Sequence, residues 1–146
     1  MGYCTDTEYE EFMRSVLPFE HMLVESGIQL FKYYLDISKD EQTRRLKDRR
    51  ADPLKQWKIS PVDEVAIKHW NDYSEARNEM FARTHNEITP WYIVRANDKK
   101  QARLNVIRHL MSLVNCPDRD DHAANPDQDT VFIFDEKHLS SGKISA

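Results

Sequence analysis

The chain has 146 residues, of which 40% are hydrophobic and 32% are charged, and its formal net charge is −4. This length and composition favour one helix-rich globular domain, and the sequence has no internal repeat. No apolar run reaches the roughly 18 residues that a membrane-spanning helix needs, and the acidic start does not resemble a secretory signal peptide. We therefore expect a cytoplasmic protein without membrane contact, in which Cys4 and Cys116 form neither a disulfide framework nor a zinc site.

The amino-terminal region is predicted to contain helix followed by a strand. Thr5 and Glu8 have the spacing of a capping box, which predicts a helix start. Pro18 predicts either an interruption of this helix or the first turn of a second one, and Gly27 predicts a left-handed helix end. Ile28–Ile37 is apolar and rich in branched and aromatic residues, so we expect a largely buried strand there.

A further helix is predicted directly after this strand. Ser38 and Glu41 have the spacing of another capping box. The helix should end near Asp52–Pro53, because the residue before a proline avoids helical conformation. Ser60–Pro61 then begins the next helix, whose apolar positions recur close to helical spacing as far as Phe81.

The remaining elements complete an α/β order. Trp91–Val94 predicts a short second strand, and Asp98 with Gln101 predicts the start of a helix that follows it. A strand, a helical insert, a second strand and a helix in this order are typical of an α/β fold. From residue 115 to 146 we expect an acidic, mostly flexible tail, in which Val131–Phe134 is one strand-like or docking segment.

The stretch from residue 44 to 58 is strongly basic, with seven cationic side chains and two acidic ones. On a helix, Glu41 can pair with Arg45, and Arg44 can pair with Asp48. Arginine suits bidentate contact with phosphate oxygens, and α/β sheets bind ligands at the carboxyl ends of their strands. We interpret the stretch as a candidate phosphate-binding site. Its candidate residues are Arg44, Arg45, Arg49, Arg50, Lys55 and Lys58.

A solvated cationic surface is the competing interpretation of this stretch. Arg49, Arg50, Lys55 and Lys58 have no evident local partner in the sequence, so their charge is available either to solvent or to an anion. Trp57 can stack on a base, brace the lysine stems or be buried in the core.

A second candidate site lies at the turn after Trp91–Val94. Asn97, Asp98 and Lys99 occupy the turn between a strand and its helix, where α/β sheets place ligand loops. A helix-capping role for Asp98 is the alternative, and it is compatible with a ligand role for its neighbours.

Other catalytic signals are weak. The six histidines show no paired metal-ligand spacing, and no serine or cysteine lies in a nucleophile motif. We therefore predict no metal site in this chain and assign no catalytic residue.

Five blocks of the sequence carry a family resemblance. They are "MGYCTDTEYEEF", "EHMLVESGIQLFKYYLDIS", "DEQTRRLKDRRADPLKQWKISPVDE", "WNDYSEARNEMFARTH" and "PWYIVRANDKKQARLN". In these blocks, from about Met1 to Val114, the chain resembles the second family of polyphosphate kinases, the polyphosphate:nucleotide phosphotransferases. Residues 115–146 lie outside the resemblance.

The resemblance implies a P-loop kinase-like fold, with three layers, a parallel sheet and a helical lid at about residues 39–83. It implies a magnesium-dependent transfer of phosphate between inorganic polyphosphate and a nucleoside mono- or diphosphate. The basic residues of the stretch from 44 to 58 would bind polyphosphate and nucleotide phosphates in the lid region. Asn97, Asp98 and Lys99 would lie near the nucleotide.

The sequence departs from the family in one large respect. It contains no glycine-rich phosphate-binding loop, because its only glycines are Gly2, Gly27 and Gly142. We therefore expect the carboxyl-terminal portion of such an enzyme, with the Mg²⁺ ligands in the missing portion. Two buried strands need neighbours, so we also expect homo-oligomerisation or a need for the missing half. The alternative function is a non-catalytic module that binds polyphosphate or RNA, although the negative net charge disfavours long nucleic acids.

Overall fold

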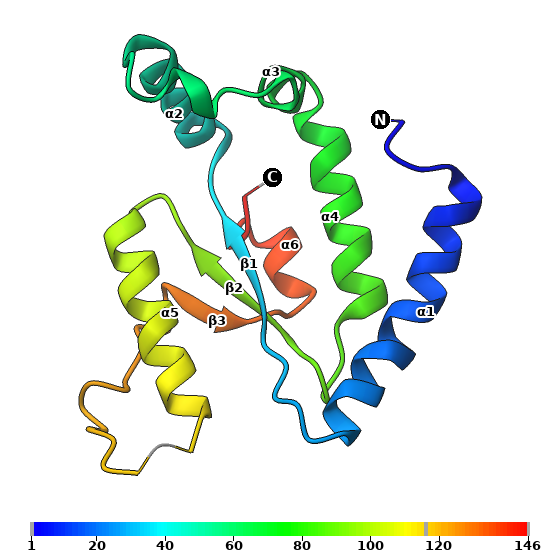
Figure 1. Cartoon of the computed structure of the whole chain (residues 1–146), viewed down its shortest axis with the longest axis vertical. Helices are drawn as coiled ribbons and strands as arrows, with labels where there is room; N and C mark the ends of the chain where they lie inside the picture. Colours follow the sequence, from blue (N-terminus) through cyan, green and yellow to red (C-terminus); the bar gives the residue numbers. More distant parts are fainter. Residues whose placement is uncertain (1, 116, 146) are drawn as a thin grey trace.

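The computed structural model describes residues 2–115 and 117–145, which form a sheet flanked by helices (Figure 1). In chain order, the elements are α1 (Asp6–Glu25), β1 (Lys32–Asp36), α2 (Lys39–Ala51), the 3-10 helix η1 (Gln56–Lys58), α3 (Pro61–Lys68), α4 (Trp70–Thr84), β2 (Trp91–Arg95), α5 (Lys99–Leu113), β3 (Val131–Ile133) and α6 (Lys137–Ser140). The α2–α4 segment is therefore inserted between the first two strands.

The sheet has three strands in the order β1-β2-β3 and is mixed. β1 is parallel to β2, whereas β3 is antiparallel to β2, with Phe132 opposite Ile93. The α/β class is confirmed, but the prediction of a wholly parallel sheet was wrong. After α5, the chain returns to the carboxyl end of β2, where the Arg95 amide donates to the Thr130 carbonyl. β3 therefore enters the sheet from that end and runs in the opposite direction.

Two apolar clusters, one on each side of the sheet, hold the helices against it. Ile93 of β2 packs with Phe81 of α4, whereas the next residue, Val94, packs with Ala102 of α5. Successive side chains of a strand point to opposite faces, so α4 and α5 cover opposite faces of the sheet, as Figure 1 shows. The molecule thus has a helix layer, a sheet layer and a second helix layer.

The first helix is continuous through Pro18, so the predicted break or restart there was wrong. Each half of the helix is fixed to the rest of the fold by an ion pair with a residue distant in the sequence. Arg83 of α4 binds Glu10, and the buried Lys32 of β1 binds Glu20. These contacts offset the backbone hydrogen bond that the proline removes. The helix ends as predicted, because Gly27 adopts a positive φ of 91°.

Two further elements differ from their predicted extent. Only the part of Ile28–Ile37 from Lys32 to Asp36 is strand, because only these residues pair with β2. The predicted helix from Ser60–Pro61 to Phe81 is divided at His69, which ends α3 and precedes α4. The helix start predicted at Ser60–Pro61 is present, and Ser60 forms a capping box with Asp63 there.

Parts of residues 117–145, which lie in the segment predicted to be a mostly flexible tail, pack against the rest of the fold. The predicted strand-like segment is present as β3. Phe134 and Ile144 are buried in the cluster around Phe81. Polar and acidic residues separate these apolar anchors along the chain, so the average composition of the segment conceals its packing.

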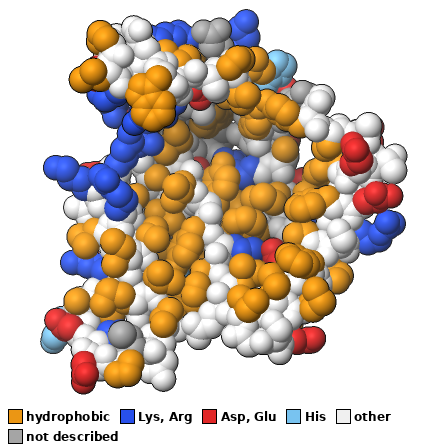
Figure 2. Space-filling model, in the orientation of Figure 1, with side chains coloured by type: hydrophobic (Ala, Val, Ile, Leu, Met, Phe, Trp, Pro, Cys, Tyr) orange, Lys and Arg blue, Asp and Glu red, His pale blue; other side chains and the backbone are white. Residues whose placement is uncertain are grey.

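One edge of the sheet is open. Among the described residues, β1 pairs with β2 alone, so its other edge has no strand beside it. Leu35 of β1 is 61% exposed, and Figure 2 shows a broad band of apolar side chains across this face of the molecule. No helix in the described part of the chain is long and apolar enough to cross a membrane.

Candidate functional site

The candidate site forms where two helices begin beside each other. β1 and β2 are parallel, so α2 and α5 both begin at the carboxyl end of the sheet. The Ser38 hydroxyl accepts from the Glu41 amide and caps α2. The Asp98 carboxylate accepts from the amides of Lys100 and Gln101 and caps α5. The two short polar turns before these helices therefore have fixed conformations.

Direct hydrogen bonds join the two turns. The Asn97 Oδ1 atom accepts from the Ser38 amide at 3.0 Å, and the Ala96 amide donates to the Asp36 carbonyl at 2.7 Å. The side chain of Asn97 is therefore occupied in connecting the turn after β2 to the turn after β1. It fixes the position of α2 relative to α5.

A pocket of about 840 Å³ lies between α2, η1 and the start of α5. Eight cationic side chains, three carboxylates and one amide line it. The lining residues are Glu41, Arg44, Arg45, Asp48, Arg49, Lys55, Lys58, Asn97, Asp98, Lys99, Lys100 and Arg103. Blue side chains gather in this region at the upper left of Figure 2. We call it the basic pocket.

The basic pocket brings together the two groups of residues that the sequence analysis selected separately. Eight of the nine candidates line it: Arg44, Arg45, Arg49, Lys55, Lys58, Asn97, Asp98 and Lys99. Arg50 does not line it, and its carbonyl accepts a hydrogen bond from the Gln56 side chain near the end of α2.

Arg45 holds α2 against the turn after β2. Its Nε atom donates to Glu41 at 2.6 Å, and one Nη atom donates to the carbonyls of Ala96 and Asn97 at 2.5 and 3.1 Å. The side chain is only 16% exposed. Hydrogen bonds from Arg44 and then Arg45 lower the pKa of Glu41 to about 2. Both predicted pairs, Glu41 with Arg45 and Arg44 with Asp48, are present.

Three other cations of the pocket also have carboxylate partners. Arg44 contacts both Glu41 and Asp48. Arg49 pairs with Asp63 of α3 at 3.2 Å, and Lys55 pairs with Asp52 at 2.5 Å. Lys55 therefore has a local partner, contrary to the expectation, whereas the partner of Arg49 is distant in the sequence. The Arg49 contact forms only when α3 folds beside α2, so local spacing in the sequence does not predict it.

Four cations of the pocket have no carboxylate partner within the described part of the chain. They are Lys58, Lys99, Lys100 and Arg103. The positive charge of Arg45, followed by burial and the charge of Arg49, lowers the pKa of Lys99. Cationic charge is concentrated at this point, because eight Lys and Arg side chains line one pocket.

Lys100 and Arg103 are absent from the predicted site, although the sequence contains a signal for them. Arg103 lies four positions after Lys99 and three after Lys100, so a helix that begins at the Asp98 cap presents Arg103 beside both lysines. With this spacing taken into account, the candidate site includes the first residues of α5 as well as the loop before it.

Trp57 lies beside the pocket and is not in the core. Its side chain is 78% exposed, so the interpretation as a buried residue was wrong. The indole nitrogen donates to the Leu54 carbonyl at 2.9 Å, and the Lys58 ammonium lies 5.0 Å from the ring centroid. The ring therefore contacts the ammonium of Lys58.

A smaller hollow of about 370 Å³ adjoins the basic pocket and shares Asn97 and Asp98 with it. At its base, the carboxylate of the buried Asp36 accepts from the amide and the hydroxyl of Ser145, both at 3.0 Å. The last described residues of the chain thus cover the carboxyl end of β1.

The carboxylates of the basic pocket do not fit a magnesium site by themselves. Glu41 and Asp48 are occupied by Arg44, and Asp98 caps α5. Among the described residues, no group of three or more His, Cys, Asp or Glu side chains could hold a metal ion. The pocket is instead suited to an anion with several negative charges, because its cations outnumber its carboxylates.

Comparison with known proteins identifies the family. Residues 1–122 match the model of polyphosphate kinase 2 (PPK2). The chain is 49% identical over 139 residues to NDP-polyphosphate phosphotransferase 2 of Ruegeria pomeroyi. The match covers 95% of this chain and 40% of that protein. It is also 53% identical over 111 residues to ADP-polyphosphate phosphotransferase of Pseudomonas aeruginosa. This match covers 76% of this chain and 36% of that protein.

A solved structure agrees with this assignment. Polyphosphate kinase 2 of Arthrobacter aurescens superposes with a TM-score of 0.70 at 37% identity, over 84% of this chain and 46% of that protein. This chain spans about 40% of the length of the Ruegeria relative. Both the sequence and the arrangement of the elements therefore match, and the chain belongs to the polyphosphate kinase 2 family of phosphotransferases.

Proposed function

We propose that this chain is the carboxyl-terminal portion of a phosphotransferase that transfers phosphate between inorganic polyphosphate and a nucleoside mono- or diphosphate. In this proposal the complete enzyme has a P-loop kinase-like fold and lies in the cytoplasm. Residues 39–83 act as a helical lid over the active site. The observation that carries the proposal is the basic pocket, in which eight cationic side chains converge at the carboxyl end of a parallel strand pair.

The chemistry of phosphoryl transfer explains why such a pocket is useful. The transferred group passes through a transition state whose charge is spread over its oxygens, and the protein contributes mainly positioning and charge stabilisation. Cations fixed before the substrate arrives need little reorganisation during the reaction. Arg45 and Asn97 hold the two sides of the basic pocket together in this way.

We propose that transfer also requires chain outside these 146 residues. The sequence contains no glycine-rich loop that could surround a phosphate with backbone amides, and β1 has an open edge beside which further strands can pair. Mg²⁺ would be held by phosphate oxygens together with ligands from that additional portion. Nucleic acid is not part of the proposal, because the net charge of the chain is −4.

The test is ATP formation from ADP, long-chain polyphosphate and Mg²⁺. The 146-residue chain is compared with a chimera that carries the preceding part of the Ruegeria relative. We expect activity in the chimera and little or none in the short chain. A matched control is the chimera with Arg108→Ala, which removes a cation of α5 outside the basic pocket. A folded chimera that makes no ATP would contradict the proposal.

A further inference from the structure

Two buried charges mark the ends of the segment that is inserted between β1 and β2. Asp36 is the last residue of β1, where the insert begins, and Arg77 lies in the middle of α4, where the insert returns to the sheet. Both residues are buried, but Arg77 Nη1 and Asp36 Oδ1 are 3.9 Å apart. This distance is too long for a hydrogen bond, so each buried charge needs a further partner.

Ser145 is a partner of both charges. Its amide and its hydroxyl each donate to the Asp36 carboxylate at 3.0 Å, and its carbonyl accepts from Arg77 at 2.5 Å. The neighbouring Ile144 is buried in the apolar cluster on the α4 side of the sheet. We call residues 142–145 the strap. In Figure 1, the chain after α6 runs between β1 and α4, where the strap makes these contacts.

The half of α4 that precedes Arg77 has open space on two sides. A hollow of about 310 Å³ lies between this half, α3 and β1, and a second hollow of about 230 Å³ lies between it and the α6 region. Arg77 lines both hollows. Later in α4, Phe81 is fully buried in the apolar cluster. One half of α4 is therefore tightly packed, whereas the other half has room to shift.

Loss of the strap would leave the two charges without these partners. A buried charged group without a hydrogen bond is costly. The Nε atom and one Nη atom of Arg77 already donate to Asn78, so they are not available to replace Ser145. Arg77 recovers a partner only if α4 moves toward Asp36 or if water enters the hollows beside it. Either response loosens the first half of α4 and the helix α3 that precedes it.

We propose that the strap is a latch for the lid. While Ser145 bridges Asp36 and Arg77, it holds residues 61–76 in position, and release of the strap lets them move. The contacts beside the basic pocket hold α2 separately, so α2 does not follow this movement. The inference deepens the proposed function, because it rests on the assignment of residues 39–83 as a lid and names the contact that controls one part of it.

Hydrogen–deuterium exchange of the 146-residue chain tests the latch. Ser145→Ala removes the hydroxyl that donates to Asp36. Exchange in residues 61–76 should become about three- to tenfold faster, which is the change in an opening equilibrium that one hydrogen bond supplies. Exchange in α2 should stay at the wild-type rate. Ser145→Thr retains a hydroxyl and should restore wild-type exchange in residues 61–76.

Ser140→Ala is the matched control. The Ser140 hydroxyl donates to the Lys137 carbonyl within α6, close to the strap in the sequence but outside it. The same serine-to-alanine change at this position should leave exchange in residues 61–76 unchanged. Thermal melts verify that all variants are folded.

Arg77→Gln tests the other side of the bridge. It should also accelerate exchange in residues 61–76, because the guanidinium no longer donates to the Ser145 carbonyl. Ser145→Ala should then have no further effect in the Arg77→Gln background, since the connection between the strap and α4 is already broken. Additive effects would show that Ser145 acts on the lid by another route and would overturn the inference. If Arg77→Gln does not fold, the two Ser145 variants still decide.

Two further results would overturn the inference: unchanged exchange in residues 61–76 of the folded Ser145→Ala variant, or equal acceleration in Ser140→Ala. These outcomes are separable from the proposed function, because the measurement needs neither polyphosphate nor turnover. A chimera that makes ATP while Ser145→Ala exchanges normally supports the function and rejects the latch. Accelerated exchange together with an inactive, folded chimera rejects the function and retains the connection between the strap and residues 61–76.

Discussion

Arg45 illustrates how a cation in an anion-binding pocket can have a structural role. Its guanidinium contacts one carboxylate and two carbonyls from different parts of the chain. These contacts use the planar fork of arginine, which a lysine ammonium cannot reproduce. The side chain therefore positions α2, and its charge contributes to the pocket only secondarily.

The first prediction separates these two roles. Arg45→Ala should lower the free energy of unfolding by about 1–3 kcal/mol, because it leaves polar groups without partners. Arg45→Lys should recover only part of the loss, since it restores the charge without the fork. Urea denaturation measures both. Arg44→Ala is the control and should change stability by less than about 1 kcal/mol, because the Arg44 side chain is 61% exposed. Full recovery in Arg45→Lys would mean that charge alone matters.

The second prediction concerns the pH dependence of the Glu41 contacts. Arg44 and Arg45 lower the pKa of Glu41 from 4.5 to about 2, while Lys99 faces the same pocket. A lowered pKa in the folded state stabilises the protein above the unfolded pKa, and this contribution is lost as pH falls from about 4.5 to about 2. The difference in urea midpoint between wild type and Glu41→Gln should therefore shrink across this range. A constant difference would contradict the role of the ionised carboxylate.

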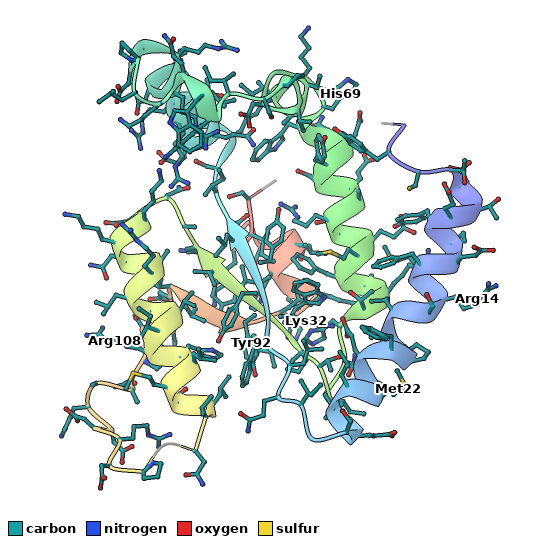
Figure 3. The ribbon with its side chains drawn as sticks, viewed as in Figure 1. Arg14, Met22, Lys32, His69, Tyr92 and Arg108 are labelled. Carbon is teal, nitrogen blue, oxygen red and sulfur yellow. The ribbon has the colours of Figure 1, made fainter. Side chains whose placement is uncertain are left out.

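At the scale of elements, a buried ion pair fixes α1 to the sheet. The Lys32 ammonium of β1 donates to Glu20 at 2.8 Å and to the Thr84 carbonyl at 2.6 Å (Figure 3 labels Lys32). The same Glu20 oxygen accepts from Thr89. One charged pair thus connects α1, β1, the end of α4 and the loop before β2.

The third prediction tests this connection. Lys32→Met should destabilise the chain by about 3–5 kcal/mol, because it leaves the Glu20 charge buried without its partner. Glu20→Leu combined with Lys32→Met should cost less than the single lysine change, since neither charge then remains. Chemical denaturation of wild type, both single variants and the double variant gives the coupling energy. Additive effects would show that the two side chains do not interact.

The carboxyl-terminal segment offers a second test at this scale. Ile144 is 2% exposed in the apolar cluster with Phe81 and Phe134, whereas Ile133 of β3 is 53% exposed. Ile144→Ala should therefore lower stability by about 2–5 kcal/mol. Ile133→Ala, the matched control, should cost much less. Equal and small effects would favour the flexible tail that composition suggests.

The elements also show what the sequence could predict. The caps of α1, α2, α3 and α5 were predicted because each depends on residues a few positions apart. Residues on both sides of the basic pocket were predicted, because each of the two turns beside it follows a predicted strand. The antiparallel β3 and the pairing of Arg49 with Asp63 were not predictable from local spacing. They depend on segments that meet only after folding.

The molecule as a whole leaves a large apolar surface beside its open strand edge. Leu35 lies on that edge, and Phe12, Phe19 and Met22 of α1 are more than half exposed. An open edge with apolar neighbours favours pairing with further strands, from another copy or from another part of the same protein. The basic pocket is built from other elements, so the two surfaces can be tested independently.

The last prediction follows from this surface. The 146-residue chain should self-associate, and Leu35→Lys should reduce the association because an ammonium on the edge opposes strand pairing. Sedimentation velocity over a range of concentrations measures the effect. Leu54→Lys is the matched control: Leu54 is 83% exposed but lies outside the sheet, between α2 and η1, and its change should not matter. The chimera with the preceding segment should associate less than the short chain, because additional strands would cover β1. If Leu35→Lys leaves the association unchanged, another surface is responsible and the open edge is not the contact.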